Sequence, residues 1–140
     1  MSETIHASTV AIAGRAVLIE GPSGAGKSDL ALRLIDRGAV LVSDDYTILT
    51  AEGDILVASA PAAIAGRIEI RGIGILPITH IERAPVAILV SLSGQVPRLP
   101  EAESRCFEGV AIPAIRLDSR EASAPIKVEL ALKHLLDGPS

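Results

Sequence analysis

Short apolar runs separated by turn residues recur along most of this chain, and this spacing predicts a domain rich in strands. The runs that predict strands are residues 10–12, 16–20, 39–43, 46–50, 55–58, 84–91 and 110–115. Ala13-Gly14-Arg15 and Gly53-Asp54 separate neighbouring runs by a few turn residues, which predicts two β-hairpins. Because residues 39–43 and 84–91 are apolar throughout, we expect both to be central strands that are covered on both faces.

Two other segments show helical spacing. Apolar residues recur on one face between Lys27 and Arg37, and Gly38 follows where the end of a helix favours positive φ. Residues 125–136 predict a second helix that starts at a proline and is followed by Gly138-Pro139. We expect residues 1–4 to be frayed and residues 93–109 to form an exposed loop with one helical turn. Together the elements predict a single α/β domain over residues 1–140.

Composition and charge narrow the function. The chain is 49% hydrophobic, yet it has one Phe, one Tyr and no Trp, so aromatic platforms that stack nucleic-acid bases are not expected. Thirteen Lys and Arg against 17 Asp and Glu give a net charge of −4, which argues against a nucleic-acid partner. The apolar runs are far shorter than the ~18 residues of a membrane span, and no signal sequence opens the chain, so we expect a cytoplasmic protein without a membrane partner.

The remaining cysteine and histidines add little chemistry. Cys106 is the single cysteine and cannot form an internal disulfide, and we expect it to be half-buried in a loop. No cluster of Cys and His indicates zinc. We interpret His80 and His134 as surface residues.

A glycine-rich string lies between the predicted strand 16–20 and the first predicted helix. Gly21-Pro22-Ser23-Gly24-Ala25-Gly26-Lys27-Ser28 matches the pattern G-x-x-x-x-G-K-[ST] in full. Its glycines allow successive backbone N–H groups to surround phosphate oxygens, and the helix that follows points its positive dipole end at the same place. Lys27 would reach the β- and γ-phosphates, and the Ser28 hydroxyl would bind Mg²⁺. The string predicts binding of ATP with Mg²⁺; the alternative is a glycine-rich turn that binds nothing.

Two adjacent carboxylates, Asp44 and Asp45, follow the predicted strand 39–43. Ligands of open parallel sheets bind beyond the carboxyl ends of the strands, so we expect this pair and the glycine-rich string to face one crevice. One carboxylate would then approach the metal, and the other would accept a proton from the hydroxyl that receives the phosphoryl group. Without the glycine-rich string, a simple turn or helix cap would be the better interpretation.

Glu69-Ile70-Arg71-Gly72-Ile73-Gly74-Ile75 is a third informative string. In an extended chain Glu69 and Arg71 share a face, which would bring a carboxylate to the metal and a guanidinium to the transferring phosphate. The same alternation is also typical of an edge strand with a solvated polar face.

The string GPSGAGKSDLAL, the string LVSDD and the string at residues 69–75 resemble the catalytic domain of bacterial HPr kinase/phosphorylase. The resemblance covers about residues 6–136 and weakens after Ser91. It implies a P-loop kinase domain similar to the nucleotide-binding fold of phosphoenolpyruvate carboxykinase. It also implies an ATP- and Mg²⁺-dependent serine kinase that acts on the phosphocarrier protein HPr or a homologue in sugar phosphotransferase signalling. Reversal by phosphorolysis and a homo-oligomer, a hexamer in full-length members, are further implications.

The resemblance assigns roles to individual residues. His6 lies fifteen residues before the glycine-rich string, as the family's catalytic histidine does, although read alone it is a tail residue. Asp45 matches the family's proton acceptor, and Asp44 matches the neighbouring aspartate. The other assignments are Lys27 as the phosphate-binding lysine, Ser28 and Glu69 as Mg²⁺ ligands and Arg98 as a catalytic arginine.

Two departures from the family pattern leave alternatives open. We expect a short form that contains the catalytic domain alone, without the regulatory N-terminal domain of longer members. The family's Pro-Val-Arg-Pro-Gly-Arg segment, which is tied to dephosphorylation, is hardly retained in residues 112–118, which leaves the phosphorylase activity open. The alternatives are a small-molecule kinase of the shikimate type, with residues 93–109 as a lid bearing Arg98 and Arg105, and an ATP-sensing regulatory module without transfer chemistry.

Overall fold

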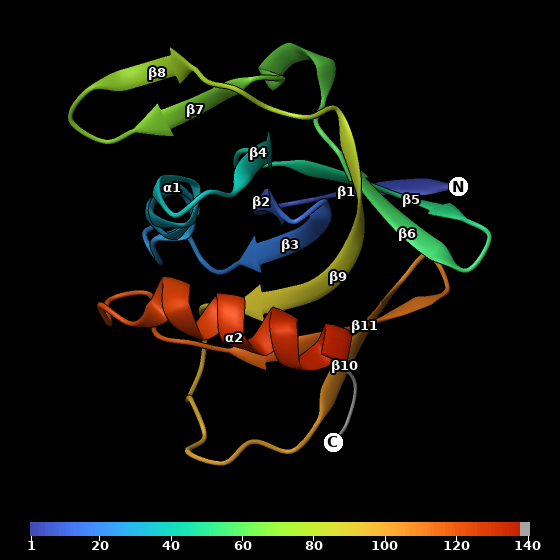
Figure 1. Cartoon of the computed structure of the whole chain (residues 1–140). Helices are drawn as coiled ribbons and strands as arrows, with labels where there is room; N and C mark the ends of the chain where they lie inside the picture. The colour runs from blue at the N-terminus through green and yellow to red at the C-terminus, as the bar shows by residue number, and fades with distance from the viewer. Residues whose placement is uncertain (138–140) are drawn as a thin grey trace.

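The computed structural model describes residues 1–137, which form a mixed α/β fold (Figure 1). The helices are α1 (Lys27–Asp36) and α2 (Ala124–Asp137), with a short 3₁₀ turn at Ala62–Ile64. The strands are β1 (Ser2–Ile5), β2 (Ala7–Ile12), β3 (Arg15–Glu20), β4 (Val40–Ser43), β5 (Thr47–Glu52), β6 (Ile55–Ser59), β7 (Arg67–Ile70), β8 (Gly74–Pro77), β9 (Arg83–Ser91), β10 (Glu103–Phe107) and β11 (Val110–Arg116). Gly138-Pro139, expected to follow the second helix, lie outside the described residues.

Nine strands form one sheet with the order β1-β5-β6-β9-β3-β2-β4, and β11 joins it beside β9 and carries β10. The long strand β9 pairs antiparallel with β6 near its start and parallel with β3 and β11 near its end. It is therefore central, as its apolar sequence predicts. Both predicted hairpins, β2–β3 and β5–β6, are present. At the β2–β3 turn Ala13 and Gly14 both have positive φ, as the two-residue turn favoured by twisted hairpins requires.

The two faces of the sheet bury different aliphatic clusters. Helices α1 and α2 cover one face through Leu30 and Leu34 and through Val128 and Leu132. On the other face β5, β6 and β11 fold toward β3 and enclose a second cluster around Leu18 and its neighbours. Figure 1 shows β9 curving between these two regions. Within the described residues, no helix is long and apolar enough to cross a membrane.

The prediction that residues 39–43 form a central strand is wrong. Strand β4 is the last strand of the sheet and pairs antiparallel with β2, because β2 inserts between β3 and β4. Since β2 is antiparallel to both neighbours, β3 and β4 still run in the same direction. Their carboxyl ends therefore meet at one edge, although the sheet is mixed rather than parallel.

Two segments expected to be irregular are strands. Residues 2–5 form β1, which pairs with β5, instead of a frayed tail. Residues 103–107 form β10 on β11 in place of the expected loop with a helical turn. Cys106 is consequently on a strand and exposed, not half-buried in a loop. Among the described strands, β1 and β10 each pair with one neighbouring strand only. The backbone hydrogen bonds of that pairing hold each strand in the sheet, and the polar side chains remain in solvent.

Strands β1 and β2 pair with β5 and β4 as one antiparallel ribbon that bends between the two pairs. Ile5 pairs with Thr47 before the bend, and Thr9 pairs with Ser43 after it. The offset is the same at these two pairs, so residues 6–8 lie opposite residues 44–46, and the register shifts by one residue only after Thr9. We call residues 6–8 and 44–46 the ribbon corner. It lies at the edge where β3 runs into residues 21–26, and it contains His6 and both aspartates.

Candidate active site

The glycine-rich loop, residues 21–26, connects the end of β3 to the start of α1. Gly24 and Gly26 have φ values of 84° and 93°, which residues with a side chain rarely adopt. Lys27 is buried, and its Nζ donates hydrogen bonds to the carbonyl oxygens of Gly21 at 2.8 Å and Pro22 at 3.3 Å. The ammonium is thus held by carbonyls of the loop itself, at the position where the loop meets the helix.

The carboxylate of Asp44 is buried and joins three parts of the fold. Its Oδ1 accepts hydrogen bonds from Ser28 Oγ on α1 at 2.6 Å and from Ser8 Oγ on β2 at 3.0 Å. Its Oδ2 accepts the backbone N–H of Glu69 on β7 at 2.9 Å. A buried carboxylate needs such donors because nothing else replaces its hydration. The convergence of Ser28 and Asp44, expected from the sequence, is present.

Asp45 points away from Asp44 and toward solvent. Its side chain is 54% exposed, and its Oδ1 lies 2.6 Å from His6 Nε2. Because a carboxylate can only accept, Nε2 carries the proton of this hydrogen bond. The His6 ring also stacks on Tyr46 with a centroid separation of 5.1 Å. The structure therefore brings into contact His6 and Asp45, two residues to which the resemblance assigns separate catalytic roles.

The backbone at Asp45 explains why adjacent carboxylates diverge. Asp45 has a φ of 68°, and the Tyr46 N–H donates to the Asp44 carbonyl at 2.8 Å, which closes a γ-turn. This conformation is strained for a residue with a side chain, and such strain is typical of functional sites. The turn sends Asp44 inward to Ser28 and Asp45 outward to His6.

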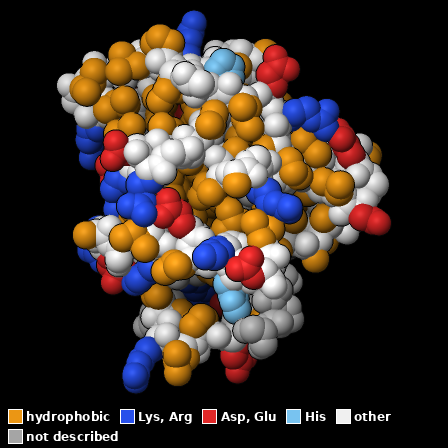
Figure 2. Space-filling model, viewed as in Figure 1, with side chains coloured by type: hydrophobic (Ala, Val, Ile, Leu, Met, Phe, Trp, Pro, Cys, Tyr) orange, Lys and Arg blue, Asp and Glu red, His pale blue; other side chains and the backbone are white. Residues whose placement is uncertain are grey.

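The β7–β8 hairpin stands apart from the large sheet beside α1 (Figure 1). The Glu69 backbone reaches Asp44, but its side chain is exposed. Arg71 follows the end of β7 and lies in the turn at the hairpin tip, so it does not continue the extended face of Glu69 as expected. Hydrophobic side chains gather over the hairpin in Figure 2, where Ile73, Ile75 and Leu76 are exposed.

Arg98 does not lie in contact with the other candidate site residues. It lies in the exposed segment between β9 and β10 and, within residues 1–137, makes no hydrogen bond or ion pair with the other candidate site residues. Arg105, considered as part of a lid, is on β10 and forms two hydrogen bonds to Glu20, at 3.0 and 2.7 Å. These contacts raise the pKa of the Arg105 guanidinium. Because β10 is paired in the sheet, residues 103–107 do not form a free lid.

A cleft of about 820 Å³ opens beside the glycine-rich loop, between the loop, residues 92–96 and the turn that precedes α2. Ser119 in that turn donates to the Ala25 carbonyl at 2.6 Å and packs against Gly26. On its rim, hydrogen bonds from Arg120 lower the pKa of the Asp118 carboxyl to about 2. The cleft is therefore lined by loop backbone and by charged groups of both signs.

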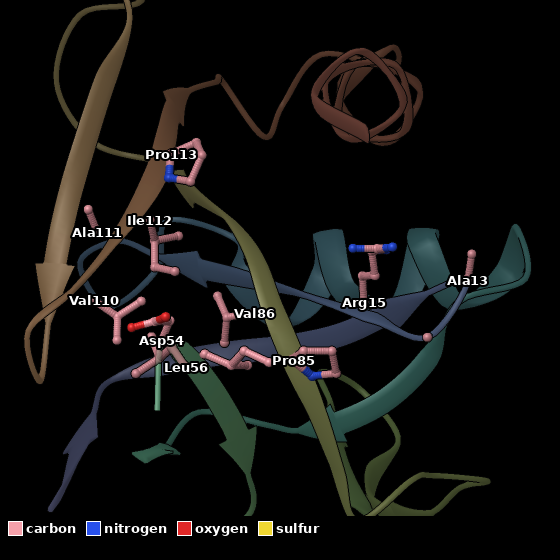
Figure 3. Close-up of a pocket in the computed structure, with 12 residues that line it drawn as sticks. Ala13, Arg15, Asp54, Leu56, Pro85, Val86, Val110, Ala111, Ile112 and Pro113 are labelled. Carbon is pink, nitrogen blue, oxygen red and sulfur yellow. The ribbon is translucent and has the colours of Figure 1, made fainter. Parts of the chain in front are cut away.

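A second concavity, of about 530 Å³, lies at the opposite end of β3 (Figure 3). Its walls come from the β2–β3 turn, the start of β6 and strands β9 and β11, with Arg15 and Asp54 at its rim. It contains none of the residues that the sequence predicts for catalysis, ATP binding or metal binding. We therefore centre the candidate active site on the glycine-rich loop and the ribbon corner.

The residues present suit Mg²⁺, which prefers oxygen ligands and uses few protein groups beside water and phosphates. The Ser28 hydroxyl and the Asp44 carboxylate, 2.6 Å apart, are such a donor set. Among the described residues no three Asp, Glu, His or Cys side chains converge on one point. A site of this kind does not require such a cluster, because the nucleotide completes the coordination.

Sequence reasoning missed two contacts. Ser8 contacts both aspartates, through Asp44 Oδ1 and the Asp45 N–H, and its one available signal was a polar side chain within an apolar strand. Ser119 hydrogen-bonds to the glycine-rich loop from a turn that is distant in sequence. No sequence pattern near Ser119 predicts this contact.

Comparison with known proteins shows the family of this chain. Residues 1–83 match the family described as HPr Serine kinase C-terminal domain. The chain belongs to this family. The HPr kinase/phosphorylase of Peptoclostridium acidaminophilum is 47% identical over 81 residues, covering 57% of this chain and 26% of the relative. The HPr kinase/phosphorylase of Lactiplantibacillus plantarum is 34% identical over 129 residues, covering 82% of this chain and 41% of the relative.

A solved structure of the HPr(Ser) kinase/phosphatase from Coxiella burnetii has the same mixed α/β fold, with a TM-score of 0.84 and 31% identity. The similarity covers 96% of this chain and 92% of that chain. The chain spans between about a quarter and two fifths of the length of the two curated relatives described above. The match to the HPr serine kinase family includes the glycine-rich loop, the ribbon corner and the β7–β8 hairpin.

Proposed function

We propose that this chain transfers the γ-phosphoryl group of ATP, with Mg²⁺, to a serine hydroxyl of the phosphocarrier protein HPr or a homologue. The observation that carries the proposal is the division of the adjacent aspartates. Asp44 is buried against Ser28 beside the glycine-rich loop, and Asp45 faces solvent beside His6. Phosphoryl transfer needs these two environments, one for the metal and one for the acceptor.

The glycine-rich loop supports the nucleotide end of the proposal. Its backbone N–H groups and the start of α1 favour the β- and γ-phosphates. Lys27 would exchange its two carbonyl partners for phosphate oxygens, which is favourable because a buried ammonium gains more from an anion than from carbonyl dipoles. The cleft beside the loop offers room for the rest of the nucleotide.

Ser28 and Asp44 would hold Mg²⁺, and Glu69 is a further candidate ligand. The ion would neutralise charge that develops on the phosphate oxygens and would align the γ-phosphoryl group. Asp44 Oδ1 already faces Ser28, so the protein side of the site is organised by its own hydrogen bonds. Arg71 and Arg98 are proposed at the transferring phosphate, which requires movement of the hairpin tip and of the segment after β9.

Asp45 would act as the general base. Its carboxylate accepts the proton of the serine hydroxyl as the serine oxygen bonds to the γ-phosphorus and the bond from that phosphorus to the β,γ-bridging oxygen breaks. ADP carries away the electron pair of the broken bond. His6 donates to Asp45 Oδ1 and so leaves Oδ2 free to face the acceptor. In phosphorolysis, an oxygen of inorganic phosphate would bond to the phosphorus of phosphoserine as the bond from that phosphorus to the serine oxygen breaks. Asp45 would return a proton to the serine oxygen, and the phosphoryl group would leave as pyrophosphate.

Membership of the family also supports proposals about the fold, the cellular location and the assembly of the chain. We infer a P-loop fold related to that of phosphoenolpyruvate carboxykinase, a cytoplasmic setting where ATP and HPr are available, and a homo-oligomer. The exposed apolar side chains of the β7–β8 hairpin and of α2 are compatible with contacts between copies.

The test is transfer of labelled phosphate from ATP to purified HPr homologues. We expect transfer by the unaltered chain, loss of more than a hundredfold in Asp45→Asn with ATP binding retained, and loss of ATP binding in Lys27→Ala. Asp54→Asn, an exposed aspartate at the far end of β3, is the matched control and should retain full activity. Transfer only to a metabolite would favour a small-molecule kinase, and binding without any transfer would favour an ATP-sensing module.

A further inference from the structure

Ser8 is a fully buried hydroxyl in the middle of the candidate site. It lies on β2 within the ribbon corner, and the pairing offset sets it opposite Asp44. Its neighbours along the strand are the buried residues Ala7, Thr9 and Val10. A hydroxyl in such surroundings is unfavourable unless its hydrogen-bonding groups are satisfied. The partners it uses therefore indicate what it does.

The Ser8 hydroxyl uses its donor on one aspartate and an acceptor lone pair on the next. It donates to Asp44 Oδ1 at 3.0 Å and accepts the backbone N–H of Asp45 at 3.1 Å. One oxygen atom thus holds the side chain of Asp44 and the backbone of Asp45. A hydroxyl is one of the few side-chain groups that donates and accepts through a single atom, so neither alanine nor valine can replace it.

Both contacts fix the feature that separates the two carboxylates. The Asp45 N–H belongs to the strained γ-turn, and a bond to it favours the left-handed conformation over the alternatives. The bond to Asp44 Oδ1 orients the same oxygen that accepts from Ser28. Without the Ser8 hydroxyl, the orientations of the Asp44 carboxylate and of the Asp45 backbone would be held less firmly.

We propose that Ser8 is a positioning residue that assigns different roles to the adjacent aspartates, Asp44 toward Ser28 and the metal and Asp45 toward His6 and the acceptor. This inference rests on the proposed function. Ser8 touches neither nucleotide nor acceptor in this assignment, and it acts through the two aspartates alone.

Thr9 provides a matched control one position along the same strand. It is equally buried, and its hydroxyl bonds Thr47 Oγ1 at 2.8 Å, but it contacts neither aspartate. Thr9→Val and Ser8→Ala each remove one buried hydroxyl of β2. A difference between them isolates the contact with the aspartates from a general loss of stability. Ser8→Thr keeps the hydroxyl and is the rescue variant, with the smaller Ser8→Cys as a weaker donor if the added methyl group prevents folding.

The first measurement is hydrogen exchange at the Asp45 amide in protein free of nucleotide and metal. We expect about tenfold faster exchange in Ser8→Ala, near-normal exchange in Ser8→Thr, and no local change in Thr9→Val, since only the first loses the acceptor of this N–H. Equal exchange in Ser8→Ala and Thr9→Val would overturn the proposal. This readout needs no catalysis, so it stands even if HPr is not the acceptor.

The second measurement separates binding from turnover. Ser8→Ala should lower kcat roughly ten- to hundredfold and weaken the Mg²⁺-dependent part of nucleotide affinity, while affinity for ATP without Mg²⁺ stays within about twofold. Ser8→Thr should restore both, and Thr9→Val should change neither. A change confined to overall stability would assign Ser8 a structural role and refute the positioning role. Absence of transfer by the unaltered chain would instead refute the proposed function and leave the exchange and affinity tests decisive for Ser8.

Discussion

Gly24 and Gly26 both adopt positive φ in the glycine-rich loop, but their surroundings differ. A Cβ at position 24 would meet no atom within 4 Å, whereas a Cβ at position 26 would lie 2.8 Å from Ser119 Oγ. We predict that Gly24→Ala lowers the free energy of unfolding by about 1 kcal/mol through backbone strain alone. Gly26→Ala should lose roughly 1–3 kcal/mol more because it also overpacks against Ser119.

Urea unfolding of both variants checks this difference. In a double-mutant cycle, Ser119→Ala should recover part of the excess cost of Gly26→Ala and none of the cost of Gly24→Ala. Equal costs at the two glycines would show that Ser119 yields freely and does not brace the loop.

The ionisation of Asp118 predicts how the stability of the folded state depends on pH. Hydrogen bonds from Arg120 lower its pKa to about 2, so the ionised pair contributes to the folded state above the ordinary aspartate pKa of ~3.9. That contribution is lost as the pH falls from about 4 toward about 2. We expect the Asp118 carboxyl carbon to titrate by NMR with a midpoint near 2, and Arg120→Ala to move the midpoint back toward ~3.9. Arg15→Ala, at the distant start of β3, should leave it unchanged.

Among the elements, the β7–β8 hairpin depends on few attachments. Ile68 is its one fully buried large side chain, and the Glu69 N–H holds it to Asp44. At its base the Ile78 N–H donates to the Gly66 carbonyl. The hairpin that carries Glu69 and Arg71 is therefore attached near Asp44 and free at its tip.

We predict that Ile68→Ala loosens this hairpin more than it loosens the sheet. The lost packing should cost about 2–5 kcal/mol, against about 0.5–1.5 kcal/mol for Ile68→Val. Amide exchange in β7 and β8 should accelerate well before that in β3 and β9. Ile75→Ala, at a site 65% exposed, is the control and should change neither. Uniform acceleration over the whole chain would mean that the hairpin unfolds together with the sheet.

The elements also show what the sequence could predict. Helix α1 and the two hairpins follow from local patterns, and Gly38 indeed has a φ of 111° after the helix. The position of β4 was not predictable, because an apolar run reads the same at the centre of a parallel sheet and at the edge of a mixed one. Strands β1 and β10 were missed because their stability comes from backbone pairing with partners far along the chain, not from their own polar side chains.

For the site, the sequence predicted that the glycine-rich string and the aspartate pair face one crevice, and Ser28 does contact Asp44, although part of the argument was wrong. The two segments meet because β3 and β4 are parallel on either side of β2, not because they are neighbours in a parallel sheet. Only the family pattern singled out His6, and its contact with Asp45 was not predicted. The roles of Arg71 and Arg98 depend on positions that the described fold leaves exposed, so they stay predictions.

For the whole molecule, the exposed apolar side chains predict self-association. Ile75 on the β7–β8 hairpin and Leu130 on α2 are 65% and 61% exposed. We expect sedimentation equilibrium to give a mass above the 14.5 kDa of one chain. Ile75→Glu and Leu130→Glu should both fold, since neither site is buried, and the variant that returns to one chain's mass identifies the face that associates. A single-chain mass for the unaltered protein would contradict the homo-oligomer.

The ribbon corner has a consequence for how this protein tolerates change in length. Its contacts, Ser8 with Asp44 and His6 with Tyr46, are cross-strand pairs that share the offset of the β1–β5 pairs and of Thr9 with Ser43, ahead of the register shift between Thr9 and Val10. Deleting or inserting a single residue in either arm would turn each side chain beyond that point to the opposite surface of its strand. A single substitution alters one contact, but a change in length by one residue would shift the pairing register. That shift would separate His6, Ser8, Asp44 and Asp45 at once.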